Sequence, residues 1–341
     1  CIRDSTIPVY GYFAADGDAA NTGATSGNIW QVKFAPNATG EWNFEALLTK
    51  GKEIALTQFD TPKNGEAVWN VSGSFEVMPV DSIAGGFYKT GKLAYVGRHY
   101  LEESETGRAF LKNGVGSPEN FLAYHQFDGT FDNGGADTPT LNNGLHEYPT
   151  HVADWKSGDP TWGEGRGKGI IGALNYLAAK GMNSLYFLTM NENGDGNDVW
   201  PWTGPKEQTR YDVSKLAQWE KVFTHMDGLG IAMNVFTQET ENDTLLNKGE
   251  LGLERKLYYK ELVARFGHHL GIEWNIGEEN DFPVAVQEQF AAYLKQIDPY
   301  DHPVSVHTPP TAEEETYGPL LGNTDFAMTA FQTGSPSIPQ S

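Results

Sequence analysis

Acidic side chains recur in this sequence directly after short apolar segments. Glu239 and Glu241 follow the segment 231–237, and Glu278 and Glu279 follow the segment 272–276. If these segments are parallel strands, the residues after them meet at the sheet edge where α/β folds bind ligands. Hydrolysis of a glycosidic bond needs one carboxylic acid to protonate the leaving oxygen and a second carboxylate as nucleophile or base. The pattern therefore predicts a concave site suited to sugar chemistry.

Amide and imidazole side chains follow the same segments, and we expect them to orient sugar hydroxyl groups together with the acids. The predicted substrate-binding set from strand ends is Asn191, Gln238, Glu239, Glu241, Asn242, Asn280, His307 and Gln332. Neighbouring residues of a regular strand point to opposite faces, so only one of Glu278 and Glu279 should enter the site. Adjacent acidic groups raise each other's pKa, which helps one of them stay protonated near neutral pH.

Tryptophan side chains divide into two groups by their local sequence. Pyranose rings stack on aromatic faces, so Trp200 and Trp202, which lie among Gly, Asp and Pro, are predicted to bind substrate. Trp155 and Trp162 lie in similar loops, and the alternative for each loop tryptophan is packing beneath its own loop. Five others occur on periodic segments and are predicted to be core residues: Trp30, Trp42, Trp69, Trp219 and Trp274.

Helix and strand patterns alternate after residue 167. Predicted strands are 184–190, 231–236, 272–276, 304–306 and 326–330, and predicted helices are 170–178, 216–226, 251–270 and 286–297. This repetition indicates a parallel sheet, either doubly wound or a (β/α)8 barrel. No glycine-rich phosphate fingerprint follows a strand, which argues against dinucleotide binding.

The first 110 residues favour strands. The segments 31–34 and 41–46 alternate around a turn and predict a hairpin, and 73–78 is another alternating run. We expect an antiparallel β-sandwich here. Residues 127–167 are too long for an ordinary connection and predict a functional loop.

Composition excludes some classes of protein. The 341 residues include 24 Lys+Arg and 45 Asp+Glu, a formal net charge of −21. Such a charge argues against a general nucleic-acid binder and against attraction to anionic lipid. No apolar run is long enough for a membrane helix. Cys1 is the one cysteine, so no internal disulfide is expected; it is either a free thiol or the lipid-modified residue of a bacterial lipoprotein.

No metal or cofactor is predicted. The segment 191–196 resembles the start of a calcium loop, but Trp202 occupies its twelfth position, where Glu is needed. The acidic stretch 128–137 is a second, weak candidate for calcium. His268 and His269 end a helix, and no carboxylate stands at the usual zinc spacing, so a role at the helix dipole or cap is favoured over metal binding.

Several motifs resemble a family of bacterial glycoside hydrolases in which a β-sandwich domain precedes a clan A-like (β/α)8 barrel. The N-terminal stretches 11–17, 30–36 and 39–42, the junction 110–130, and the acidic motifs 238–243 and 274–280 are similar to that family. The resemblance implies a β-sandwich domain over 1–105 and a barrel domain over 106–341. It also implies a retaining hydrolase of a polysaccharide or oligosaccharide, secreted, periplasmic or cell-surface in a bacterium.

In that family the acid/base glutamate ends the fourth strand and usually follows Asn. The resemblance places it at Glu279, with Glu278 at the position where Asn is usual. Counting 109–113 as the first strand gives about six of eight barrel strands, so the barrel is expected to be incomplete in this chain. The nucleophile, which ends strand seven in the clan, is expected outside it.

Two other functions remain open at this point. A barrel without a strand-seven carboxylate could be a non-catalytic carbohydrate-binding or scaffold protein. A polysaccharide lyase with a Tyr or His base would need a basic subsite for a uronic acid within an acidic chain.

Overall fold

Five parallel strands form the central sheet of the protein. The computed structural model describes residues 6–56, 65–81, 83–116, 118–134, 144–194 and 196–332. Within these residues the sheet order follows the chain order. The strands are β8 (Gly114–Val115), β9 (Ser184–Leu188), β10 (Ala232–Phe236), β11 (Ile272–Asn275) and β12 (Val304–Ser305).

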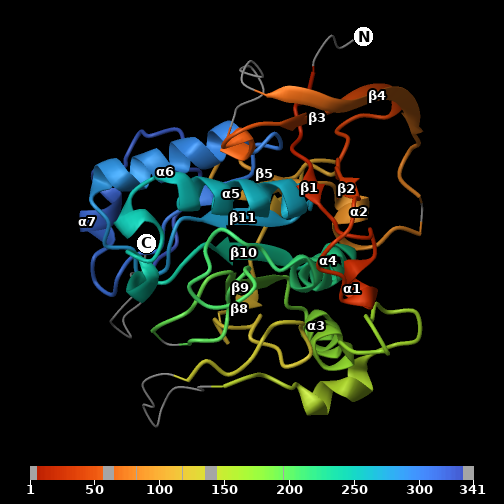
Figure 1. Ribbon diagram of the computed structural model, residues 1–341. Coiled ribbons are helices and arrows are strands. Elements are labelled where there is room, and N and C mark those ends of the chain that lie inside the picture. The colour runs from red at the N-terminus through yellow and green to blue at the C-terminus, as the bar shows by residue number, and fades with distance from the viewer. Residues whose placement is uncertain are drawn as a thin grey trace.

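One long helix lies between each pair of consecutive strands, and these helices cover one side of the sheet. They are α3 (Lys168–Ala179), α4 (Val213–Leu229), α5 (Leu253–Phe266) and α6 (Val284–Ile297). Figure 1 shows them following one another around the sheet in chain order. The structure therefore confirms the predicted alternation of helices and strands after residue 167.

Side chains on one face of the strands build the main core with these helices. Leu185, Phe187, Val235 and Trp274 belong to a single buried cluster that includes helix residues. The ring of Phe187 lies 5.3 Å from that of Phe223 on α4. Since residues of a strand alternate between faces, the intervening side chains face the other side of the sheet.

The caps of α4 show how its ends are defined. Asp212 at the N-cap accepts a hydrogen bond from the Lys215 N–H at 3.0 Å. This bond satisfies one of the backbone donors left free at a helix start. Gly230 ends the helix in the left-handed conformation with φ 73°, which glycine adopts at little cost. β10 begins two residues later, at Ala232.

The strand order distinguishes between the two predicted α/β architectures. A doubly wound sheet reverses its order at a switch point, whereas here each new strand pairs beside the previous one. The order is that of part of a barrel. The first parallel strand is β8, not the predicted 109–113, because Ala109–Phe110 forms β7 of a separate antiparallel sheet. The predicted strand 326–330 is reduced to one bridge, between His307 and Ala330.

Three small antiparallel sheets occupy the N-terminal third. They pair β1 (Tyr12–Phe13) with β2 (Trp30–Gln31), β3 (Gly40–Lys50) with β4 (Glu66–Val77), and β5 (Leu93–Ala94) with β6 (Leu101–Glu103) and β7 (Ala109–Phe110). The predicted hairpin between 31–34 and 41–46 is wrong, because β2 pairs with β1 and β3 with β4. In Figure 1 the β3–β4 ribbon runs along the top of the view, apart from the parallel sheet. A β-sandwich is thus not confirmed in the described residues, and the predicted boundary after residue 105 stays a prediction.

Short helices complete the described structure. They are α1 (Ala19–Thr22), α2 (Gly86–Thr90) and α7 (Glu313–Tyr317), with 3-10 turns at η1 (Ile54–Leu56), η3 (Pro149–Asp154), η4 (Thr240–Asn242) and η5 (Asn247–Gly249). Over the described ranges, no helix combines the length and apolar character needed to cross a membrane.

The N-terminal segment packs against the helices of the parallel sheet. Tyr12 and Ala14 form a buried cluster with Ala264 of α5. The Arg265 guanidinium lies 4.4 Å from the centre of the Tyr12 ring and donates a hydrogen bond to the Phe13 carbonyl at 2.8 Å. The first strand pair is therefore attached directly to the outer surface of the helical layer.

Close packing of η3 on α3 gives a stability prediction at Gly172. A Cβ there would lie 1.8 Å from the His151 carbonyl oxygen. On an open helix surface Gly→Ala is stabilising, but the clash reverses the sign here. We expect Gly172→Ala to lower the free energy of unfolding by about 1–3 kcal/mol, measured by urea denaturation. Gly204→Ala, where no atom lies within 4 Å, is the control and should change it little. A stabilised Gly172→Ala protein would contradict this packing.

Candidate functional site

The face of the parallel sheet opposite the helices carries polar side chains. Tyr186 on β9 pairs in register with Asn234 on β10, which in turn pairs with Glu273 on β11. Tyr186 and Asn234 are half-buried, although they lie in the middle of their strands. Glu273 is fully buried near the start of β11 and forms an ion pair with Lys112. This polar face leads to the carboxyl ends of the strands, where the sequence predicted the site.

Three carboxylates meet at those strand ends. Glu119 follows β8, Glu239 follows β10 and Glu278 follows β11, and one oxygen from each lies within 4.8 Å of the others. Glu239 and Glu278 are only 3% and 6% exposed, and Glu119 is half-buried. Ionised carboxylates at this separation repel one another in a partly dry environment. The arrangement favours a shared proton, a bound cation or a ligand with hydroxyl donors.

Tyr186 faces this group of acids. Burial, followed by the negative charges of Glu278, Glu119 and Glu239, holds the pKa of Tyr186 well above its usual value. Its hydroxyl therefore remains protonated throughout the physiological range and can act as a hydrogen-bond donor. The Tyr186 ring also lies 4.0 Å from that of Phe236 on the same face, which fixes its position above the strands.

The turn after β11 separates the two adjacent glutamates. The Glu278 N–H donates to the Gln238 carbonyl at 2.9 Å, so Glu278 stays attached to the β10 side of the sheet. Glu279 has a left-handed backbone with φ 43° and is less buried than Glu278. Its carbonyl accepts a hydrogen bond from the Thr240 hydroxyl at 2.6 Å. The structure thus brings the Glu278 carboxylate into the acidic group and gives Glu279 main-chain contacts at its edge.

His307 closes the β12 side of the site. Burial lowers the pKa of His307 to about 4, so the imidazole is neutral near pH 7. Its Nδ1 accepts a hydrogen bond from the Glu279 N–H at 3.0 Å, which leaves the ring proton on Nε2. The 3.5 Å contact between His307 Nδ1 and Glu278 Oε1 is therefore not an ion pair at neutral pH. It places the Glu278 carboxyl beside the imidazole ring.

The loop after β9 covers the acids from the other side. Gly194 has φ 112°, and a Cβ there would lie 2.6 Å from the Glu239 carboxylate. Asn191 is fully buried, and neither atom of its amide has a hydrogen-bond partner within the described residues. The Asn120 and Asn191 side chains both lie beneath Gly196, within about 3 Å of where its Cβ would be. Buried amides of this kind are rare away from a ligand or water site.

Two predicted substrate-binding amides, Gln238 and Asn242, have structural partners instead. The Gln238 amide donates to the Asp243 carboxyl and accepts from Arg255, both within the protein interior. Asn242 accepts from the Glu192 N–H at 2.9 Å and donates to the Asn193 carbonyl at 2.7 Å. These bonds hold the loops after β9 and β10 together, so these two amides support the site from behind.

Asn280 and Asp243 extend this support. The Asn280 amide oxygen accepts from Gln287 of α6 at 3.0 Å and from the Phe282 N–H at 3.2 Å. Burial, and then hydrogen bonding to Asp281, raise the pKa of Asp243 to about 8. Asp243 is thus held as a carboxylic acid at neutral pH and can share a proton with its acidic neighbour.

The two predicted substrate-binding tryptophans are not at a ligand surface. Trp200 and Trp202 are both 0% exposed, which corrects the sequence prediction. Trp200 packs under the Lys215 ammonium, 4.7 Å from the ring centre. Trp202 donates to the Glu192 carboxylate at 2.6 Å. Their rings fill the space beneath the long loops, so neither can stack on a sugar in this conformation.

Two predicted residues lie at the margin of the site. Glu241 is exposed within η4. Gln332 is positioned beside the β12 end, because its N–H donates to the Thr308 hydroxyl at 3.0 Å.

Sequence reasoning missed Glu119 and Tyr186. Glu119 follows the first parallel strand, and shifting that strand from 109–113 to β8 would have placed it at a strand end. Tyr186 has the period-two position of an inward-facing residue, but a continuous apolar run hides that alternation.

Side chains of the metal-ligand type gather at two places in the described residues. One is the group of Glu119, Glu239 and Glu278, and the other joins Glu220 with His268 and His269. The two stretches considered for calcium, 128–137 and 191–196, lie partly outside the described residues.

Comparisons with known proteins give matches in structure alone. The sequence matches no family model and no curated protein. A glycoside hydrolase candidate from Bacteroides vulgatus has a TM-score of 0.65 and 14% identity, and the match covers 98% of this chain and 55% of that one. This chain therefore spans about half the length of that neighbour.

Two more distant matches are a glycoside hydrolase family 5 protein from Bacteroides vulgatus and a family 5 mannosidase variant from Rhizomucor miehei. The first has a TM-score of 0.43 at 16% identity over 67% of this chain and 41% of that one. The second has a TM-score of 0.38 at 11% identity over 64% and 61%. The 0.65 match shows that the chain shares its overall fold with the glycoside hydrolase candidate.

Proposed function

We propose that this chain is the sugar-binding and catalytic part of a glycoside hydrolase that cleaves a polysaccharide or oligosaccharide. The carrying observation is the convergence of Glu119, Glu239 and Glu278 at the carboxyl ends of a barrel-like sheet. Barrel enzymes place their reacting groups at that end, and glycosidases need closely spaced carboxyl groups. The shared fold with a glycoside hydrolase candidate supports the proposal.

In this proposal Glu278 protonates the leaving oxygen. β11 is the fourth strand of the sheet. The family resemblance assigns the acid/base after this strand to Glu279, and we place it on the neighbouring Glu278 instead. Glu278 is the more buried of the two and its carboxylate lies among the other acids. Tyr186, as a protonated hydroxyl, and His307, through Nε2–H, donate hydrogen bonds to the sugar.

A retaining reaction also needs a second carboxylate about 5–5.5 Å away. Glu119 and Glu239 are near enough to Glu278 for this role. Glu119 is the better placed because the Gly194 loop covers Glu239. The alternative is that the nucleophile lies outside this chain, as the family resemblance implies. Replacing Glu119 and Glu239 in turn shows whether either of them is the second carboxylate or whether it lies outside this chain.

Replacing each of the adjacent glutamates tests the assignment of the acid. We expect Glu278→Gln to lower kcat on a polysaccharide by about 100-fold or more, because general acid catalysis contributes on that order. Glu279→Gln, the matched control, should stay within a few-fold of the unchanged protein. Release of reducing ends from a panel of polysaccharides is the measurement.

Aryl glycosides with a good leaving group need little protonation, so Glu278→Gln should retain more of its activity on them. Loss of activity on these substrates in Glu119→Gln or Glu239→Gln would identify the second carboxylate. If Glu279→Gln is the inactive variant, the assignment to Glu278 is wrong. Binding of glycans without any released sugar would instead favour the non-catalytic carbohydrate-binding function.

The neutral state of His307 gives a pH-dependent prediction. Its pKa falls from 6.5 to about 4 on folding because of burial. As the pH falls, the His307 imidazole of the unfolded chain therefore binds a proton before that of the folded chain does. The stability that neutral His307 contributes is complete above pH 6.5 and is lost as the pH falls toward 4. We expect a loss on the order of 3 kcal/mol across that window.

His307→Asn keeps an acceptor for the Glu279 N–H but cannot titrate. Urea denaturation at intervals between pH 7 and pH 4 should therefore show a shallower decline for this variant than for the unchanged protein. His99→Asn, at an exposed site, is the control and should follow the unchanged protein. Identical pH profiles for all three proteins would contradict a buried neutral His307.

A further inference from the structure

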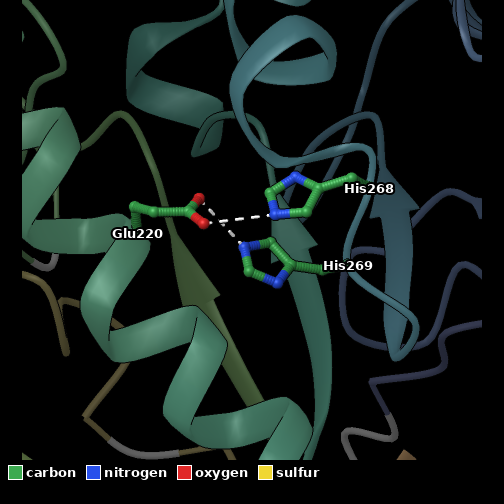
Figure 2. Close-up of side chains that lie close together, drawn as sticks. All are labelled: Glu220, His268 and His269. Carbon is green, nitrogen blue, oxygen red and sulfur yellow. Dashed lines mark hydrogen bonds and ion pairs between the residues drawn. The ribbon is translucent and has the colours of Figure 1, made fainter. Parts of the chain in front are cut away.

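A second cluster of ligand-type side chains lies at the other end of the sheet. Glu220 projects from α4, and His268 and His269 follow α5, just before β11 begins. Figure 2 shows the carboxylate and the two imidazole rings pointing toward one another. This cluster precedes β11, whereas Glu278 follows it, so the two groups are at opposite ends of the strand. The proposed sugar chemistry makes no use of it.

The distances within the cluster suit a small cation. His268 Nε2 lies 3.2 Å from one Glu220 oxygen, and His269 Nε2 lies 3.1 Å from the other. One ligand atom from each of the three residues lies within 4.8 Å of the others. Zinc bonds to imidazole nitrogen and carboxylate oxygen are about 2.0–2.2 Å long. In a tetrahedron such ligands are about 3.3 Å apart, so small movements would accommodate the ion.

Asp227 orients one of the imidazoles from behind. His269 Nδ1 is 2.8 Å from the Asp227 carboxylate, which itself accepts hydrogen bonds from the Leu270 and Gly271 N–H groups. A carboxylate on Nδ1 keeps a proton there and turns Nε2 toward the metal position, where it contacts the Glu220 carboxylate in this structure. This carboxylate–histidine arrangement is typical of zinc sites, and it is a second observation independent of the three ligands.

Lys33 supplies positive charge to the cluster in this structure. Its ammonium forms an ion pair with Glu220, and its side chain is 28% exposed while that of Glu220 is 16% exposed. Lys33 lies on the segment after β2, so it can turn toward solvent without disturbing the helices. His268 Nδ1 is buried and, within the described residues, has no hydrogen-bond partner. The ion pair with Lys33 therefore leaves one buried imidazole nitrogen of the cluster without a hydrogen bond within the described residues.

We propose that Glu220, His268 and His269 form a binding site for a divalent transition metal ion of the zinc class, with Lys33 replacing the ion in the metal-free protein. Three protein ligands leave the fourth position of a tetrahedral ion to water. Bound metal would connect α4 to the turn between α5 and β11. A zinc spacing is not visible in the sequence because the carboxylate comes from α4, almost 50 residues before the histidines.

Zinc titration of the metal-free protein tests this site. All proteins carry Cys1→Ser, which removes the one thiol, and are measured at pH 8, where protons compete less with the metal. We expect one zinc ion per chain, with affinity lowered about 100-fold in His268→Ala and 10–100-fold in Asp227→Asn. His99→Ala removes an exposed histidine and should bind as the unchanged protein does.

Lys33→Met distinguishes the metal site from a simple charge cluster. If the residues bind zinc, removal of the competing ammonium raises the affinity. If the cluster serves only as an ion-pair network, Lys33→Met lowers the thermal midpoint and leaves zinc affinity unchanged, which would overturn the proposal. Equal zinc binding by His268→Ala and the unchanged protein would do the same.

Cobalt(II) binding is measured on the unchanged protein and on Lys33→Met, so it does not require the His268→Ala variant to fold. Tetrahedral cobalt bound to the unchanged protein and to Lys33→Met should absorb in the visible range, and zinc should displace it. No visible band at saturating cobalt in either protein would overturn the proposal. Neither readout involves glycoside hydrolysis, so failure of the metal site and failure of the proposed enzyme activity remain distinguishable.

Discussion

The alternation of side chains along β9, β10 and β11 is the constraint on which the site depends. Apolar residues such as Phe187, Val235 and Trp274 pack beneath the helices, so the residues between them must occupy the opposite face. There the strands carry Tyr186, Asn234 and Glu273. A shift of register by one residue would exchange the two faces and bury these polar groups in the core. Burial of the apolar face therefore determines which side chains reach the proposed sugar site.

The same constraint brings together acids that are far apart in the chain. Glu119, Glu239 and Glu278 belong to different strand–helix units, and parallel pairing in chain order places their strand ends side by side. Their mutual repulsion is a cost to folding, and the surrounding structure opposes it. Tyr186 presents a protonated hydroxyl to the acids, and Gly194 keeps the covering loop close to Glu239. Groups held at such a cost are typical of functional sites.

Much of the parallel sheet could be predicted from the sequence because periodicity reports burial directly. The apolar runs and helical stripes after residue 167 correspond to β9 through α6, and the strand ends carry the expected polar residues. The choice between Glu278 and Glu279 could not be made in this way. Strand alternation ends at Asn275, and the left-handed backbone of Glu279 reorients the chain beyond it. A turn of that kind depends on contacts with Thr240 and His307, which are distant in sequence.

The burial of the tryptophans could not be predicted from the local sequence either. Trp200 and Trp202 lie in polar, glycine-rich segments yet are fully buried, whereas Trp30 and Trp69 lie on strands and are 53% and 56% exposed. A periodic pattern shows that a residue has a defined face, but it does not show what lies against that face. The long loops fold back over large apolar rings and exclude water from them, whereas most side chains of the β3–β4 ribbon are exposed.

The two ends of the polar sheet face differ in the charges that surround their buried carboxyl groups. At the start of β11, Glu273 is fully buried beside Lys112, yet burial raises its pKa more than the lysine lowers it. That pair offsets a charge within the protein, as a structural ion pair does. At the far end of the same face three carboxylates approach one another. The proximity of three carboxyl groups at the strand ends, each rich in hydrogen-bond acceptors, is therefore the physical reason to expect a ligand with hydroxyl donors at that position.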